Sequence, residues 1–227
     1  MERSRRVNRN ADGIVLYGIG SKYVYEVYES ALRANVEVVA FIDNLETPGD
    51  YPGLAPVFVP AHCTDEHRGH GAFIPLVTPG HRKSILNELL QRGFIAGGSM
   101  IDPTAILASS TRYGSGFLVN AAVVIGANCQ FGDQVLVNRS VSIGHDAVVE
   151  DFVSFGPGCL LCGDCQIGTG AFIGGGATIA PGVHVGSNAI VGAGAVVVKN
   201  VPDNTIVVGN PAQVKRGDIV GYNKCGV

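Results

Sequence analysis

The sequence contains no tryptophan and few other large side chains. Aromatic residues make up 7% of the 227 positions, and there are only two methionines. Glycine, by contrast, accounts for 32 residues, roughly twice the usual share of about 7%. The hydrophobic content of 46% is still enough to form a core. Many glycines with few bulky aromatics predict a narrow core and frequent tight turns.

Positive charge is scarce beyond the first ten residues. The formal net charge is −3, and the folded part contains no basic block, which argues against a nucleic-acid-binding protein. The opening segment "MERSRRVNRN" carries four arginines but no apolar stretch, so it does not resemble a secretory signal. We predict that residues 1–12 form a disordered tail.

Long apolar runs and a disulfide framework are also missing. No stretch approaches the roughly 18 consecutive apolar residues of a membrane span, so we expect no membrane association. Six cysteines without a secretory signal fit a reducing cytoplasm better than paired disulfides. We therefore expect a cytoplasmic protein.

A six-residue repeat organises the second half of the chain. Starting at Ile101, every sixth residue through Val197 is apolar, and the next residue is often glycine, as at Gly126 and Gly144. A further small apolar residue recurs four places after each of these anchors, as at Cys129. A period of six matches neither a helix face nor simple strand alternation. It is typical of parallel β-helices, in which each hexad supplies a short strand and a turn.

The number of hexads sets the size of this domain. Three hexads make one triangular coil, and the 17 anchors therefore predict between five and six coils. With strands stacked about 4.8 Å apart, the resulting prism is roughly 27 Å long.

One hexad contains a histidine that is followed directly by an aspartate. In "SVSIGHDAVVEDF", His145 is the third residue of the hexad anchored at Ile143. The same position holds Asp133, Arg139 and Asp151 in other hexads, and this polar set places His145 on the outside of the prism. Imidazole titrates near neutral pH and suits general-base catalysis. From the residues alone, a solvated histidine on a turn is an open alternative.

The first half of the chain has the pattern strand, glycine turn, helix and strand. Residues 14–17 are an apolar run, residues 24–32 have apolar positions at helical spacing, and the apolar run 36–42 ends at an aspartate. The turn "GIG" resembles the start of a dinucleotide-binding fingerprint, but Tyr23 stands where the last glycine belongs. That partial fingerprint is weak evidence for a dinucleotide.

These patterns predict an α/β protein with two domains. We expect an N-terminal Rossmann-like domain over residues 13–98, with its last helix at residues 80–92. A parallel β-helix of hexapeptide repeats follows over residues 99–205. Residues 206–227 are expected to form a C-terminal tail.

Residues 101–212, which include the closing "VVGNPAQVKR", resemble the left-handed β-helix acyltransferases. The left hand is implied by this resemblance alone, because β-crossovers are ordinarily right-handed. The segment "NRSVSIGHDAVVEDFVSFGPGCLLCGDCQIG" is most similar to two-domain sugar acetyltransferases of bacterial glycan synthesis. That group includes sialic acid O-acetyltransferase and the UDP-amino-sugar N-acetyltransferases.

The resemblance implies a catalytic site. It assigns His145 as the general base, Asp146 as the acidic neighbour that raises its basicity, and Asn138 as a polar active-site residue. No nucleophilic serine or cysteine is needed for direct transfer from a thioester. The backbone N–H of Gly163 matches a position that could donate to the oxyanion of the tetrahedral intermediate.

The resemblance also implies two ligands and an assembly. Acetyl-CoA would lie between neighbouring prisms of a homotrimer, against Ser154, Gly163, Gly175 and Ala193. Ser154 departs from the member of the family that the sequence most resembles, which has a histidine there. A nucleotide-linked sugar would bind the first domain at Gly20, Ser21, Lys22, Asp43, Asn44 and Thr78.

These features together predict a cytoplasmic, acetyl-CoA-dependent sugar acetyltransferase that needs no metal. The sequence leaves open whether the acceptor is an amine or a hydroxyl. One alternative is a non-catalytic nucleotide-binding scaffold trimer. A zinc hydratase of the same helix type would need three zinc histidines, whereas only His145 and His184 lie in the repeats. A metal cluster on C-x-x-C-x-x-C is disfavoured because Cys159 and Cys165 fall on different walls of the prism.

Overall fold

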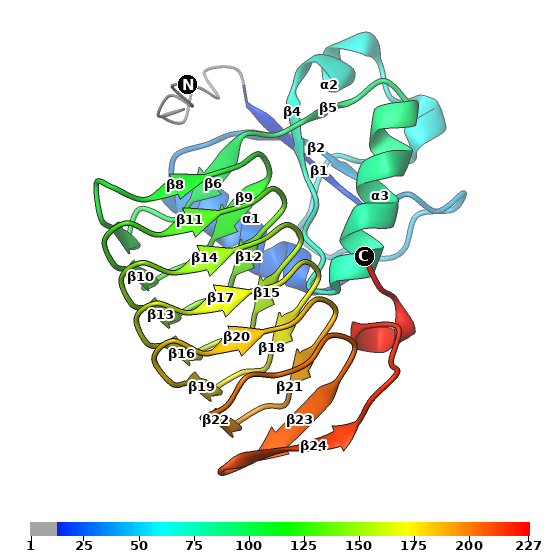
Figure 1. The fold of residues 1–227 in the computed structure, drawn as a ribbon. Helices are drawn as coiled ribbons and strands as arrows, with labels where there is room; N and C mark the ends of the chain where they lie inside the picture. The colour runs from blue at the N-terminus through cyan, green and yellow to red at the C-terminus, as the bar shows by residue number, and fades with distance from the viewer. Residues whose placement is uncertain (1–12) are drawn as a thin grey trace.

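The computed structural model describes residues 13–227. The predicted tail, residues 1–12, lies outside the described residues. Figure 1 shows an α/β domain seated against one side of a three-sided β-helix, at the end where the repeats begin. Within the described residues, no helix has the length and apolar character needed to span a bilayer.

The first domain contains one parallel sheet in the order β3-β2-β1-β4-β5. Its helices lie on both faces: α1 packs with Leu16 and Phe41, and α3 packs with Val15 and Tyr17. The carboxyl ends of the strands and the first turns of α1 and α3 meet at one edge of the sheet. The elements are β1 (Ile14–Tyr17), α1 (Tyr23–Arg33), β2 (Val38–Ile42), β3 (Val57–Phe58), η1 (Pro60–His62), α2 (Asp65–Gly69), β4 (Gly71–Phe73), α3 (Pro79–Gln91) and β5 (Ile95–Ala96).

The repeats form three flat walls of stacked parallel strands, which confirms the predicted β-helix. The first wall contains β6 (Ser99–Ile101), β9 (Phe117–Val119), β12 (Leu136–Val137), β15 (Ser154–Phe155), β18 (Phe172–Ile173), β21 (Ile190–Val191), β23 (Ile206–Gly209) and β24 (Ala212–Arg216). The second wall contains β7 (Ile106–Leu107), β10 (Val124–Ile125), β13 (Ser142–Ile143), β16 (Leu160–Leu161), β19 (Thr178–Ile179) and β22 (Val196–Val197). The third wall contains β8 (Arg112–Tyr113), β11 (Gln130–Phe131), β14 (Val148–Val149), β17 (Gln166–Ile167) and β20 (His184–Val185).

The β-helix extends further than its repeat pattern indicated. β23 pairs in parallel with β21, and β24 then returns antiparallel to β23. The predicted boundary at residue 205 is therefore wrong, because residues 206–216 continue the first wall.

The hexad phase has a direct structural basis. The anchors fill the interior, and the fourth residue of successive hexads adopts a left-handed backbone, with φ of 58° at Ala122, 60° at Asn128 and 57° at Asp146. The glycine after each anchor sits where coils approach closely, since a Cβ at Gly144 would lie 2.6 Å from the Gly163 nitrogen. Small residues at these positions allow the coils to stack at strand spacing.

Two edges of the prism matter for the site. The histidine edge joins the second wall to the third and carries His145, Gly163, Pro181 and Lys199, one in each successive coil. The asparagine edge joins the first wall to the second and carries Asn138 and then Arg139, Pro157, Gly175 and Ala193 in successive coils.

The first domain covers the upper part of the first wall. Met100, Leu118 and Leu136 point outward from that wall and pack with Val24 and Val27 of α1 in one apolar cluster. Their burial is the main attachment between the two domains, since each fully buried apolar side chain contributes about 1.5–3 kcal/mol.

A buried arginine attaches the start of α3 to the same wall. Arg82 donates to the carbonyls of Gln134 (3.0 Å) and Phe152 (2.7 Å) and to Ser154 Oγ (2.8 Å), besides Leu76 O in its own domain. Burial lowers the pKa of Arg82 to about 9, so the side chain stays protonated at neutral pH.

The last residues return to the first domain and form what we call the C-terminal strap, residues 221–227, which includes η2 (Tyr222–Lys224). Tyr222 stacks on Phe172 with ring centroids 3.6 Å apart, and Asn223 Nδ2 donates to Thr78 Oγ1 at 2.9 Å. Cys225 lies against Gly80 in the first turn of α3. The strap thus links the lower coils to the first domain.

Candidate active site

His145 lies on the histidine edge with 69% of its side chain exposed, as the hexad register predicted. Its Nδ1 is 2.7 Å from Asp146 Oδ2, and Asn128 Nδ2 donates to the other carboxylate oxygen at 3.1 Å. The hydrogen bond with His145, helped by that from Asn128, lowers the pKa of Asp146, which is therefore ionised at neutral pH. A carboxylate can only accept, so Nδ1 carries the proton and Nε2 keeps a free lone pair.

Gly163 lies directly beneath this imidazole. A Cβ at Gly163 would be 2.6 Å from His145 Nε2, so the ring rests against the glycine backbone. Within residues 13–227, the Gly163 N–H donates to no acceptor. A free base nitrogen and a free backbone donor therefore lie side by side on an open edge.

Asn138 does not join His145 within one chain. It begins the asparagine edge, at the other side of the second wall, and it is buried beneath the first domain. Its Oδ1 accepts from the Arg139 N–H at 2.8 Å and from Asn120 Nδ2 at 3.4 Å. The assignment of Asn138 to the active site therefore stays a prediction, which would require the asparagine edge of a neighbouring chain to meet the histidine edge.

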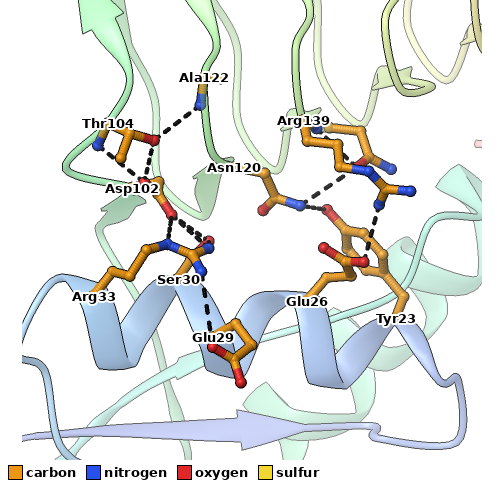
Figure 2. A network of polar contacts seen from close by, with 11 residues as sticks. Tyr23, Glu26, Glu29, Ser30, Arg33, Asp102, Thr104, Asn120, Ala122 and Arg139 are labelled. Atoms are coloured by element: carbon orange, nitrogen blue, oxygen red, sulfur yellow. Dashed lines mark hydrogen bonds and ion pairs between the residues drawn. The ribbon is translucent and has the colours of Figure 1, made fainter.

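Figure 2 shows how α1 holds the asparagine edge. Asn120 Nδ2 also donates to the Tyr23 hydroxyl at 2.7 Å, and Arg139 pairs with Glu26 at 2.9 Å. Burial raises the pKa of Tyr23, so its hydroxyl keeps its proton. The start of α1, next to Lys22, is thus fixed against this edge of the prism.

Ser154 is not available to a coenzyme. Its side chain is fully buried on the first wall, where it accepts from Arg82 and donates to Val77 O at 2.7 Å. The prediction that Ser154 contacts acetyl-CoA is wrong, because the first domain covers this position. Gly175 is half-buried and Ala193 is exposed, and both lie on the asparagine edge.

The first domain has a cavity of about 270 Å³ at the carboxyl edge of its sheet. Predicted residues Gly20 and Asn44 line it, and neighbouring Ser21 and Lys22 lie in the turn before α1. The start of α3 has no side-chain hydrogen bond at its N-cap, and within the described residues the N–H groups of Gly80 and His81 donate to no acceptor, so this helix start keeps backbone donors for an anion. The first N–H groups of α1 are already used, because they donate to Ser21 Oγ, Ser21 O and Lys22 O. The full lining is Gly18, Gly20, Asn44, Leu76, His81, Ser84 and Ile85.

Two predicted ligand contacts in this domain are used internally instead. Asp43 is fully buried, and its carboxylate accepts from the Tyr51 hydroxyl (2.7 Å) and the Gly49 N–H (2.9 Å). Thr78 is buried under the C-terminal strap, where it accepts from Asn223. Both assignments as direct ligand contacts are wrong, since these side chains organise the loops around the cavity.

Sequence reasoning missed His81 and Ser84, which line the cavity from the first turns of α3. Both residues lie within the helix predicted over residues 80–92, but no ligand contact was expected from it. The available signal was Pro79, which predicts a helix start there. Because that helix begins at the carboxyl edge of a parallel sheet, its first turn faces the usual ligand position.

Comparison with known proteins identifies the family. The chain matches the bacterial transferase hexapeptide model (six repeats) over residues 146–181 and 164–199, and the hexapeptide repeat of succinyl-transferase over residues 122–150. A solved variant of perosamine N-acetyltransferase from Caulobacter crescentus, in complex with CoA and GDP-perosamine, is 30% identical with a TM-score of 0.81. The alignment covers 90% of this chain and 97% of that one. The chain belongs to the left-handed β-helix acyltransferases built from hexapeptide repeats.

Two further solved structures are similar to this chain over most of its length. The acetyltransferase domain of PglB from Neisseria gonorrhoeae, in complex with acetyl coenzyme A, is 28% identical with a TM-score of 0.79, covering 89% of this chain and 98% of that one. WeeI from Acinetobacter baumannii is 25% identical with a TM-score of 0.64, covering 89% and 99%. No curated protein matches the chain. Family membership also confirms the left hand of the prism, against the general rule for crossovers.

Proposed function

We propose that this acyltransferase moves an acetyl group from acetyl-CoA to the amine of a nucleotide-linked sugar. The observation that carries the proposal is that His145 Nε2 and the free Gly163 N–H lie close together on one exposed edge of the prism. The cavity at the carboxyl edge of the first domain, with the uncapped start of α3 beside it, suits a nucleotide diphosphate. The ligands of the perosamine N-acetyltransferase and of PglB support the same pair of substrates.

In this mechanism the neutral amine attacks the thioester carbonyl, forming a C–N bond. Nε2 accepts the proton that the amine loses, and Asp146 stabilises the resulting imidazolium. The Gly163 N–H donates to the developing oxyanion. Collapse of the intermediate breaks the C–S bond, and the imidazolium returns its proton to the leaving thiolate.

The two halves of this site lie too far apart in one chain. The cavity lies in the domain that covers the first wall, whereas the histidine edge joins the other two walls. A ring of three chains with their second walls facing a common axis would place the histidine edge of each chain beside the asparagine edge of the next. We therefore propose a homotrimer in which each site is shared by two chains.

The surface of the second wall supports that arrangement. Its outward positions expose Ile106 (66%), Val124 (43%) and Leu160 (40%) in one line down the wall, with Ser142 between the last two. Such a row of exposed apolar side chains fits burial against further copies of the same wall. We propose that two other copies of this chain cover the second wall.

The function is tested by following free thiol release from acetyl-CoA with a panel of nucleotide-linked amino sugars. His145→Ala should lower kcat by about 100-fold or more, within the range expected for loss of a general base. His184→Ala is the matched control, because His184 is the other exposed histidine of the prism and lies on the third wall. Full activity in His145→Ala would overturn the assignment of the base, and no thiol release with any acceptor would overturn the proposed function.

A further inference from the structure

One column of residues on the prism departs from the repeat. The residue that follows the anchor in the first wall is polar in the three upper coils and glycine in the next three. The polar residues are Asp102, Asn120 and Asn138, and the strand registers of the first wall stack them in that order. Asp102 is paired with Ser30 and Arg33 of α1. Asn120 lies at a position where the repeat itself requires no side chain.

Hydrogen bonds fix how the two asparagine amides are turned. The backbone N–H of Arg139 donates to Asn138 Oδ1 at 2.8 Å, so the amide nitrogen of Asn138 faces the other way. Asn120 Nδ2 uses both of its hydrogens, on the Tyr23 hydroxyl at 2.7 Å and on Asn138 Oδ1 at 3.4 Å (Figure 2). Asn120 Oδ1 therefore faces away from both partners and remains an acceptor.

Three polar groups of this network have no partner among residues 13–227. Asn120 Oδ1 accepts from no donor, Asn138 Nδ2 donates to no acceptor, and the Tyr23 hydroxyl accepts but does not donate. The two asparagines are only 2% and 6% exposed, and polar groups buried to that extent ordinarily have a hydrogen-bond partner.

The unpaired atoms of the two asparagines can be reached from outside. In residues 13–227, Thr111 Oγ1 is the only fully buried side-chain nitrogen or oxygen that lacks a partner. Asn120 Oδ1 and Asn138 Nδ2 therefore still reach the surface. An acceptor and a donor, each held in a fixed direction, thus form a small polar site that a ligand can complete.

The chemistry and the place of this site indicate a sugar hydroxyl. A hydroxyl both donates and accepts, so it can donate to Asn120 Oδ1 and accept from Asn138 Nδ2. Tyr23 directly follows the turn at residues 20–22, and Gly20 lines the cavity of the first domain. In the proposed function the sugar extends from the diphosphate at this cavity toward the site of acetyl transfer, so it would pass the asparagine pair.

We propose that Asn120 determines specificity for the acceptor by accepting a hydrogen bond from a ring hydroxyl of the sugar. Tyr23 is a positioning residue that keeps the amide nitrogen of Asn120 turned away from the ligand. A sugar that lacks this hydroxyl leaves the buried amide groups unpaired and binds more weakly. This inference rests on the proposed function and deepens it, because it selects the sugars that can be acetylated.

A binding measurement separates a sugar contact from a structural role. Asn120→Gly gives this coil the residue that lower coils of the same column have, so we expect the fold to be kept, as a melting temperature checks. In calorimetric titrations, the nucleotide-linked amino sugar that the parent protein acetylates fastest should bind Asn120→Gly about 10-fold more weakly. The matching nucleoside diphosphate should bind both proteins equally. Asn204→Gly is the matched control, because Asn204 is an exposed asparagine near the lower end of the prism.

A kinetic measurement identifies the hydroxyl. The same sugar is compared with its deoxy analogues, each of which lacks one ring hydroxyl. One analogue should lower kcat/KM of the parent protein by about 10-fold or more, yet make little difference to Asn120→Gly. Tyr23→Phe should lose part of this discrimination, because the amide of Asn120 is then free to turn.

The outcomes distinguish this inference from the proposed function. Sugar binding that is unchanged in Asn120→Gly, or weakened equally with that of the nucleoside diphosphate, would overturn the role of Asn120 and leave a sugar acetyltransferase in place. Discrimination against the deoxy analogue that persists in Asn120→Gly would do the same. If the parent protein acetylates no nucleotide-linked amino sugar, the proposed function fails and this inference fails with it.

Discussion

At the scale of single residues, the candidate site depends on the absence of a side chain beneath its histidine. His145 is held from one side by Asp146 and from below by the backbone of Gly163. Gly163 has a backbone conformation that other residues can adopt, since it is not among the positive-φ positions. Glycine is therefore needed at this position because the imidazole leaves no room for a side chain.

Gly163→Ala should impair catalysis without harming the fold. The new Cβ would lie 2.6 Å from Nε2 and displace the imidazole, which is exposed and can shift outward without disturbing the core. We expect kcat/KM to fall about 10- to 100-fold, because misplacement of a catalytic group by about 1 Å has effects of that size. Steady-state kinetics and a melting temperature together check this.

Gly217→Ala is the control, because a Cβ there meets no atom within 4 Å. Activity of Gly163→Ala equal to that of Gly217→Ala would mean that the imidazole position does not matter.

Residue-scale predictions from the sequence succeeded where the hexad register alone decides the environment. His145 is exposed because its place in the repeat puts it at a turn. Ser154 occupies an equally regular place, yet it is buried, because Arg82 from a distant segment covers it. Asp43 and Thr78 failed for the same reason, since Tyr51 and the C-terminal strap use their oxygens. Periodicity reports local geometry but does not tell which wall another domain covers.

At the scale of elements, every turn of the β-helix from Gly116 to Gly194 has one residue in the left-handed backbone region. Aspartate, asparagine and glycine tolerate that conformation best, and they hold many of these positions. Ala122, with φ of 58°, is an exception that carries strain.

Ala122→Gly should stabilise the protein by up to about 1 kcal/mol, because glycine removes the Cβ clash of the left-handed conformation. Thermal unfolding monitored by circular dichroism measures the change. Ala108→Gly provides the comparison, since Ala108 does not have a positive φ, and it should lower stability by roughly 0.5–1 kcal/mol. A loss of stability in both variants would contradict the assigned role of the turn.

The attachment of α1 to the β-helix depends on a buried carboxylate, Asp102, shown in Figure 2. It accepts from Ser30 Oγ and Arg33 Nε at 2.8 Å each and from Thr104 Oγ1 at 2.6 Å. Burial alone would raise the pKa of Asp102, but these hydrogen bonds outweigh it and hold the pKa below its usual range. A carboxyl with a lowered folded-state pKa stabilises the fold above its unfolded pKa of about 3.9.

Asp102→Asn should destabilise the protein by about 3 kcal/mol at neutral pH, because an amide cannot accept from all these donors. The stabilisation by Asp102 is lost as the pH falls through its lowered folded-state value. The gap in melting temperature between parent and variant should therefore narrow below about pH 4. Asp65→Asn, at an exposed surface pair with Arg68, should change stability by less than about 1 kcal/mol. A gap that is constant from pH 7 to pH 2 would contradict the role of the ionised carboxylate.

At the scale of the whole molecule, the two edges of the second wall decide whether a chain can act alone. The histidine edge and the asparagine edge lie on opposite sides of this wall. The proposed ring of three chains would bring them together. The sequence predicted the three walls and the residues on them. It could not indicate which wall is free to face a neighbour, because it did not show that the first domain covers the first wall.

Leu160→Asp should dissociate the proposed trimer, because it places a charge in the apolar row of the second wall. We expect a smaller species in analytical ultracentrifugation and a loss of activity of about 10-fold or more at assay concentrations. Val148→Asp is the control, since Val148 is similarly exposed (42%, against 40% for Leu160) but lies on the third wall. A Leu160→Asp protein that is monomeric and fully active would refute the shared site.

The C-terminal strap changes how such a column can come apart. In stacked-repeat proteins each coil contacts only its neighbours, so the free end can fray one unit at a time. Here the final residues are fastened to Thr78 and Gly80 in the first domain and to Phe172 and Asn188 in the lower coils. Separating the lowest coils must first break the contacts of the strap with the start of α3 in the first domain. The lowest coils therefore cannot unfold one at a time from the C-terminal end. They separate only when the contacts between the strap and the first domain are also lost.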